Sequence, residues 1–322
     1  MKCQTLCLIL LVTSSRLISQ EILNFNTSNS GILSDSITSI AISKENHIWC
    51  GTGVVKQNQN GKGIAVFDNQ TWSRIDTSNS EILSNDISLV QFDPLGNPWI
   101  GYVEKGLSTR SSTGWTHYII LTSGSDSDYI KFVFFNNKDI WIGTFLSGLY
   151  LYENGSMRMW HIPSPAAAAK DSAGNIWFGA FTKIYRFDGQ DMNYFEEYSP
   201  DFSLSRITSL DIDKKNNIWI GLEGDGILKF DGHENWELIE SPLFHHNLGD
   251  YINAVLVNKD NVWFGTSDGL WQFDGSNWKY DLLREKFITC LAMDNFSNMW
   301  AGTSMNGVYK MSGIDVDVDI DP

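Results

Sequence analysis

Positive charge is scarce in this chain of 322 residues. It has 23 lysines and arginines against 38 aspartates and glutamates, a formal net charge of -15 and a sequence pI near 4.7. Such a balance argues against a nucleic acid or an anionic membrane as the partner. The acidity can equally serve only to keep the protein in solution. The predicted partners therefore include no nucleic acid.

Long hydrophobic runs are also missing, with one short exception near the N-terminus. Lys2 is followed by the apolar stretch 6–12, and small residues fill positions 13–15 and 19. This order is typical of a secretory signal peptide, and the run is too short to span a bilayer. We expect residues 1–19 to be removed after Ser19, with Ser15 as the alternative, and we expect no membrane insertion. The mature chain would then be exported to the periplasm or the extracellular space.

Cysteine is equally sparse, with four in the chain. Cys3 and Cys7 fall in the expected signal peptide and lie too early for a lipoprotein anchor, so Cys50 and Cys290 would remain. Export permits a disulfide between these two, whereas cysteines in strands often serve as small buried apolar residues. The sequence leaves both possibilities open.

Catalytic and metal-binding motifs are absent as well. His245 and His246 are the one histidine pair, and no cluster of Cys, Asp or Glu with metal spacing lies near them. No Ser-His-Asp spacing or paired acid stands out, and Asp211 and Asp213 are predicted to cap a turn. The acidic tail 314–322 lacks the Gly turn and terminal Glu of a calcium loop, so we expect it to be disordered. We predict no catalytic residue, no metal and no cofactor, and calcium has no support.

What the chain has in abundance is a repeat. A five-residue segment of the type Asn-Ile-Trp-Ile-Gly occurs seven times, at intervals of 36 to 50 residues. Its tryptophans are Trp49, Trp99, Trp141, Trp177, Trp219, Trp263 and Trp300. Around each lie four short stretches of strand-like alternation with turn signals such as Asp-Gly between them. This period in an all-β chain predicts a seven-bladed β-propeller of four-stranded blades over residues 20–313.

Two parts of the repeat carry specific predictions. Residues 166–169 are four alanines and would favour a helix by propensity, but their position in the repeat predicts an inner strand. The seventh unit has no fourth strand, and residues 23–30 match residues 73–80, with Thr-Ser-Asn-Ser identical. The N-terminal strand 22–26 should therefore complete the last blade and close the ring.

The repeated Asn-Ile-Trp-Ile-Gly-Thr, followed by Gly-Leu, Phe-Asp-Gly and Trp, resembles the two-component regulator propeller repeat. In that family the repeat builds the periplasmic sensor portion of hybrid regulators of Bacteroidetes-like bacteria, and it also occurs in free-standing exported proteins. The resemblance covers about residues 21–313. It implies a sensor-type ligand binder, although no kinase, receiver or DNA-binding domain accompanies the propeller here.

The predicted site lies on the face that carries the variable loops, because rigid rings usually bind there. Aromatic faces with convergent polar groups suit sugar rings. The candidate ligand-binding residues are Tyr102, Glu104, Lys105, Phe145, Phe181, Lys183, Glu223, Asp225, Asp268 and Asn306.

The sequence leaves three functions open. The first is a monomeric, exported, non-enzymatic binder of a small saccharide or surface glycan, which could pass a signal to a two-component regulator. The second is a protein-interaction scaffold whose partner is an envelope protein. The third is a lyase-type propeller enzyme, which needs a catalytic histidine on the loop face, where the loops between second and third strands have none.

Overall fold

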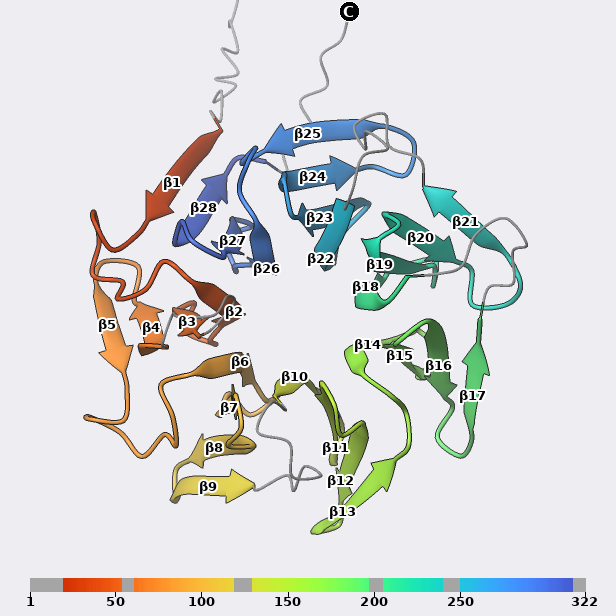
Figure 1. The fold of residues 1–322 in the computed structure, drawn as a ribbon, viewed down its shortest axis with the longest axis horizontal. Coiled ribbons are helices and arrows are strands. Elements are labelled where there is room, and N and C mark those ends of the chain that lie inside the picture. The colour runs from red at the N-terminus through yellow and green to blue at the C-terminus, as the bar shows by residue number, and fades with distance from the viewer. Residues whose placement is uncertain (1–19, 54–60, 119–128, 197–204, 240–249, 315–322) are drawn as a thin grey trace, which may run out of the picture.

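The computed structural model describes residues 20–53, 61–118, 129–196, 205–239 and 250–314. Within these ranges the chain forms 28 strands and no helix. The strands build seven antiparallel blades arranged in a ring, so the predicted β-propeller is confirmed (Figure 1). The centre of this ring, around which the inner strands lie, is called the channel below. None of the described segments has the helical length and apolarity that crossing a bilayer requires.

Each blade contributes one strand to each of four concentric positions, and blades are numbered here in chain order from residue 37. The inner strands are β2 (Ile37–Ile42), β6 (Ile87–Phe92), β10 (Ile130–Asn136), β14 (Pro165–Lys170), β18 (Ile207–Ile212), β22 (Asp250–Asn258) and β26 (Ile288–Met293). The second strands are β3 (Ile48–Thr52), β7 (Pro98–Tyr102), β11 (Asp139–Thr144), β15 (Ile176–Ala180), β19 (Ile218–Gly224), β23 (Asn261–Thr266) and β27 (Met299–Thr303). The alanine run lies in β14, so its position in the repeat overrides its helix propensity.

The two outer positions complete the blades. The third strands are β4 (Gly63–Phe67), β8 (Leu107–Ser111), β12 (Leu149–Glu153), β16 (Lys183–Phe187), β20 (Ile227–Phe230), β24 (Gly269–Phe273) and β28 (Val308–Ser312). The fourth strands are β5 (Trp72–Ile75), β9 (Gly114–Tyr118), β13 (Ser156–Trp160), β17 (Met192–Phe195), β21 (Trp236–Ile239), β25 (Trp278–Leu282) and, in blade 7, β1 (Glu21–Phe25). A short pairing of Glu223 with Tyr251 and of Gly224 with Asp250 links blades 5 and 6.

The N-terminal strand closes the ring as predicted. β1 pairs with β28 in a register that runs from Glu21 opposite Ser312 to Phe25 opposite Val308, and Figure 1 shows the two strands side by side. The ring centroid of Phe25 lies 5.9 Å from that of Trp300 in blade 7 and 5.3 Å from that of Phe67 in blade 1. The latch therefore both completes one blade and fills the interface with the next.

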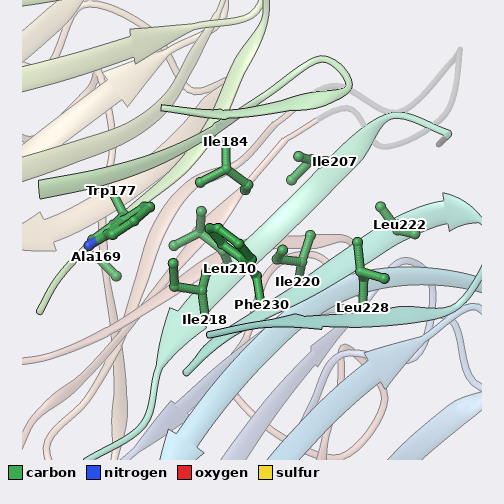
Figure 2. Close-up of a cluster of buried hydrophobic side chains, with 10 residues drawn as sticks. All are labelled: Ala169, Trp177, Ile184, Ile207, Leu210, Ile218, Ile220, Leu222, Leu228 and Phe230. Carbon is green, nitrogen blue, oxygen red and sulfur yellow. The ribbon is translucent and has the colours of Figure 1, made fainter. Parts of the chain in front are cut away.

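The hydrophobic core is divided among the interfaces between blades. Seven buried clusters occur in the described residues, and each joins two neighbouring blades. Figure 2 shows the one between blades 4 and 5, where Trp177 and Ile184 face Ile207 and Phe230. The glycine that follows the repeated tryptophan permits this packing, since a Cβ on Gly221 would lie 2.6 Å from Ile252 of the next blade. Repetition of Trp-x-Gly thus reproduces one interface around the ring.

Four blades fix the turn between inner and second strands with an aspartate. Oδ1 of Asp213 accepts the backbone N–H of Asn217 at 2.9 Å, and Oδ2 accepts the indole N–H of Trp219 at 3.0 Å. The corresponding carboxylates are Asp93, Asp171 and Asp294. The predicted turn-capping role is confirmed for Asp213. It is wrong for Asp211, which instead accepts the Val257 N–H of blade 6 at 2.8 Å.

These carboxylates predict a pH-dependent stability. Burial acts to raise the pKa of Asp294, but hydrogen bonds from Trp300, Asn298 and Phe296 outweigh it and hold the pKa below 3.8. Since the folded pKa is the lower one, the stabilisation is complete above the unfolded pKa and is lost as the pH falls through the folded value. We expect melting temperatures measured at falling pH to drop most steeply below about pH 4. A melting temperature that stays constant down to about pH 2.5 would contradict this.

Two smaller expectations concern the core and the C-terminus. Cys50 and Cys290 belong to one cluster but are free thiols here, and burial raises the pKa of Cys290 to about 12.

Ile314 was expected in the disordered tail, but this is wrong, because it is 2% exposed and packs in the cluster between blades 6 and 7. Residues 315–322 of the predicted tail and the predicted signal peptide lie outside the described residues.

Candidate functional site

Two segments of each blade meet on the loop face: the start of the inner strand and the end of the second strand. A backbone hydrogen bond joins them, as from Phe145 N–H to Tyr129 O at 3.0 Å in blade 3 and from Glu223 N–H to Arg206 O at 2.9 Å in blade 5. The same bond recurs in four other blades, at Val103–Asp86, Phe181–Ser164, Ser267–Tyr251 and Ser304–Phe287. Each of these six blades therefore presents a pair of adjacent residues beside the channel.

The pairs of blades 3 and 5 differ in chemistry and yet contact each other. The rings of Tyr129 and Phe145 are stacked with centroids 4.9 Å apart at 18°. Nε of Arg206 lies 2.7 Å from Oε2 of Glu223. Cζ of Arg206 lies 5.4 Å from the centroid of the Phe145 ring, so side chains of two non-adjacent blades meet. Blade 4 lies between them and has the small Ala166 as the second residue of its inner strand.

Lys131 completes this group, which is called the blade 3–5 cluster: Tyr129, Lys131, Phe145, Arg206 and Glu223. Its Nζ lies 5.4 Å from the centroid of the Tyr129 ring. The pKa of Lys131 is lowered, first by burial and second by the charge of Arg206, while Glu223 acts in the opposite direction. The two cations are thus close enough to repel, although they come from blades 3 and 5.

A β-bulge that recurs in every inner strand places Lys131 in this cluster. All seven inner strands carry a register shift after the first residue that pairs with the second strand. The residue at the shift is Thr38, Ser88, Lys131, Ala166, Thr208, Asn253 or Thr289. Such bulges redirect one side chain out of the regular ladder, and Lys131 is the one charged residue of the set.

Four of these bulge residues bind the neighbouring blade. Thr38 donates to Ile87 O at 2.6 Å, Asn253 to Ile288 O at 2.8 Å and Thr289 to Ile37 O at 2.6 Å. Thr208 donates likewise to Ile252 O. The remaining three are on blades 2, 3 and 4, where the Ser88 hydroxyl has no partner among the described residues and Ala166 has no donor. The bulge residues of blades 2, 3 and 4 therefore lack the bond that the other four make, although other groups link these blades, as from Ile207 N–H to Phe181 O at 2.6 Å.

The predicted site residues are distributed unevenly around the face. Phe145 and Glu223 belong to the blade 3–5 cluster. Phe181 is adjacent to it, 53% exposed with φ of 50°, and its N–H bonds to Ser164, whose hydroxyl donates to Phe145 O at 2.9 Å. Asp225 is exposed and accepts the Ser205 N–H at 2.8 Å.

The other predicted residues are not brought to this cluster. Lys183 instead pairs with Glu196 at 2.8 Å on the outer strands of blade 4. Glu104 and Lys105 are exposed on blade 2. Asp268 accepts the Glu285 N–H at 2.8 Å in blade 6, and Asn306 O accepts from Asn24 in the latch at 2.8 Å.

Tyr102 requires a correction. It was expected as an exposed aromatic platform, but it is fully buried, and its hydroxyl accepts the Leu83 N–H at 3.2 Å. Tyr102 is the last residue of β7 and occupies the same repeat position as Thr144, Thr266 and Thr303, which are also buried. Phe145 and Phe181 lie one position later in the repeat. Counting residues from the repeated tryptophan would have separated the buried position of Tyr102 from the later position of Phe145 and Phe181.

Sequence reasoning missed Tyr129, Lys131 and Arg206. Two of them directly precede an inner strand and one is its bulge residue. A comparison of the seven repeats at these two positions would have shown Arg206 and Lys131 as the two cations. Tyr129 would not have stood out, because Tyr251 and Phe287 occupy the same position in blades 6 and 7.

Histidines are the other candidate functional groups of the described ranges. Four histidines fall in these ranges: His47, His117, His161 and His233. Nδ1 of His117 lies 2.7 Å from the Ser108 hydroxyl on the outer strands of blade 2. The pair His245–His246 lies outside the described residues. No three metal-ligating side chains of the described residues gather in one place.

A second hollow lies on the opposite face, between blades 1 and 2. It is an open pocket of about 290 Å³ lined by residues that include Ser43, His47, Trp49, Phe92 and Arg110. Ser43 stands where four other blades have the turn aspartate, so no carboxylate holds the Trp49 indole. The pocket therefore arises from a departure from the repeat.

Comparison with known proteins places the chain by its fold. No family model matches it, and no curated protein matches it. Virginiamycin B lyase from Staphylococcus aureus superposes with a TM-score of 0.72 at 13% identity, over 91% of this chain and 99% of that one. The fold is shared.

Two further propellers come from bacterial envelopes. The extracellular domain of a proposed hybrid two component system from B. thetaiotaomicron gives a TM-score of 0.71 at 21% identity, over 90% of this chain and 40% of that one. PorZ, a surface component of the type-IX secretion system of Porphyromonas gingivalis, gives 0.65 at 16% identity, over 89% and 48%. This propeller thus spans less than half of either protein, and identities this low establish the fold alone.

Proposed function

We propose that this chain is an exported, non-enzymatic propeller of the two-component regulator type that binds a small saccharide or surface glycan at the blade 3–5 cluster. The observation that carries the proposal is the stacked pair Tyr129–Phe145 beside the pair Arg206–Glu223 at the channel mouth. A sugar ring has apolar C–H faces and hydroxyl edges, and this group offers an aromatic surface with hydrogen-bonding groups at its border.

The energetics of the charged pair support a binding role. The side chains of Arg206 and Glu223 are 36% and 32% exposed. Ion pairs with this much solvent contact contribute only about 0–1 kcal/mol to stability. The pair therefore contributes little to the stability of the fold. A guanidinium and a carboxylate held in place nevertheless form good hydrogen-bond partners for hydroxyl groups.

The likeness to the extracellular domain of a two component system supports a sensor-type role and export. The partner of such a role would be a two-component regulator elsewhere in the envelope. Calcium and other cofactors are not part of this proposal.

The test is a thermal-shift and calorimetric screen of residues 20–322 against mono- and oligosaccharides. A ligand at about 100 times its Kd should stabilise the protein by roughly 2.7 kcal/mol. Phe145→Ala should weaken binding about tenfold or more through loss of the stacking surface, with little change in melting temperature.

Phe296→Ala is the matched control, because Phe296 is 71% exposed in a turn of the opposite face. Unchanged affinity in both Phe145→Ala and Phe181→Ala would exclude this site. Equal losses in Phe145→Ala and Phe296→Ala would also count against it, since they would indicate a nonspecific effect.

A scaffold for an envelope protein is the second candidate, favoured by the likeness to a secretion-system surface component. A pull-down from envelope extracts with the loop-face variant Phe145→Ala as the comparison would distinguish it: a single partner retained by wild type and lost by the variant supports the scaffold. The third candidate function, a lyase-type enzyme, is supported only by the similarity of fold.

A further inference from the structure

We infer that the ligand bound at the blade 3–5 cluster carries a carboxylate, and that Lys131 is the residue that binds it. This deepens the proposed function, on which it rests, by assigning an acidic saccharide of the uronate type as the ligand class. The inference comes from the charge arrangement inside the cluster rather than from the loop face as a whole.

Lys131 is a cation in a place where a cation is unfavourable. The residue is partly buried, and no described residue accepts a hydrogen bond from its Nζ or forms an ion pair with it. Buried ammonium groups are normally paired, because desolvation of an uncompensated charge is costly. A lysine with no ionic partner among the described residues, placed beside the Tyr129 ring, is therefore a candidate binding group.

The neighbouring charges leave a local positive surplus. Arg206 and Glu223 form a pair at 2.7 Å, so the carboxylate is already engaged by the guanidinium. Of these two groups, Arg206 has the larger effect on Lys131, and that effect is repulsive. A ligand carboxylate near Lys131 would supply the missing anion. The chain as a whole carries a net charge of -15, so this attraction is local.

The geometry also fits a ring that bears the carboxylate. Lys131 Nζ lies over the Tyr129 ring at 5.4 Å, and Tyr129 stacks on Phe145. The cation and the aromatic surface are thus within one sugar residue of each other. The neighbouring bulge residues Ser88 and Ala166 do not make the bond to the next blade that Thr38, Asn253 and Thr289 make.

The experiment compares D-glucuronate with D-glucose as probes, with inorganic phosphate as a third arm, in calorimetric titrations of residues 20–322. Wild type should bind glucuronate about tenfold more tightly than glucose, the ratio expected for one charged hydrogen bond. Lys131→Met should remove this ratio by weakening glucuronate binding more than glucose binding. Lys62→Met, an exposed lysine of the same face, should retain it.

A second readout follows the lysine itself. Binding of a carboxylate favours the protonated amine, so glucuronate should raise the pKa of Lys131 and protect it from amine acylation, whereas glucose should not. Protection can be measured by mass spectrometry on the peptide that contains Lys131. Affinity for glucuronate should decline at alkaline pH as the amine loses its proton.

The outcomes separate the two proposals. Equal binding of glucose and glucuronate, or a ratio that survives Lys131→Met, overturns the carboxylate inference and leaves the saccharide function standing. Protection by phosphate and glucuronate alike, without tighter sugar binding, overturns the uronate assignment in favour of a simple anion site. Absence of binding and of protection overturns both.

Discussion

Removal of residues 20–27 lowers the melting temperature of this propeller by roughly 10 °C, because it takes away a whole strand and an aromatic anchor at once. The strand pairs with β28 over five residue positions, and Phe25 contacts Phe67, Trp72 and Trp300. Phe25 is partly buried, so its loss costs about 3 kcal/mol, and each lost hydrogen bond adds about 1 kcal/mol. For a domain of this size, each kcal/mol corresponds to about 2 °C.

The control for this deletion is removal of residues 315–322, which has the same length at the other end of the chain. We expect that deletion to leave the melting temperature within about 1 °C, since a tail predicted from its sequence to be disordered contributes little to stability. Two melting curves that coincide would refute the latch. Phe25→Ala compared with Ile22→Ala, whose residue is 43% exposed, separates the anchor from the strand.

Asp294→Ala is expected to destabilise the protein by about 3 kcal/mol or more, because it leaves several buried donors without an acceptor. Asp294 is 4% exposed. Its carboxylate accepts the N–H groups of Phe296 and Asn298, the Asn298 amide and the Trp300 indole, all at 2.9 to 3.1 Å. Trp300 is fully buried, so its indole N–H has no access to water in the variant.

Asp231→Ala is the matched control. Asp231 makes the same kind of turn, accepting from the N–H groups of His233 and Asn235, but these hydrogen bonds are exposed and no tryptophan takes part. Chemical denaturation of both variants gives the comparison. A loss in Asp294→Ala no larger than that in Asp231→Ala would show that the tryptophan link contributes nothing.

Which residues form strands and turns was decided by local interactions and could therefore be predicted from the sequence. Asp213, Asn217 and Trp219 bond within six residues of one another, and the same spacing repeats in three other blades. Residues 23–30 and 73–80, which match in sequence, also form equivalent hydrogen bonds in the structure. Asn26 N–H bonds to the Asn29 side chain as Asp76 N–H bonds to that of Asn79, both at 2.9 Å.

The sequence was less informative about side-chain direction at the ends of strands. Tyr102 and Phe145 both follow a repeated tryptophan closely, yet one is in the core and the other is at the channel mouth. A shift of one residue reverses the face of a strand residue. An aromatic residue at such a boundary is assigned correctly only by strict alignment with the other repeats.

The sequence by itself determined the all-β class, the seven blades, the strand order within them and the closure by the N-terminal strand, because these depend on period, turn residues and repetition. Only the tertiary structure brought Tyr129, Lys131 and Phe145 of blade 3 to Arg206 and Glu223 of blade 5. Each occupies a repeated position, but the residues are far apart along the chain, and the repeat alone does not show which blades face each other. Closure of the ring brings them together, because it fixes how far blade 3 lies from blade 5.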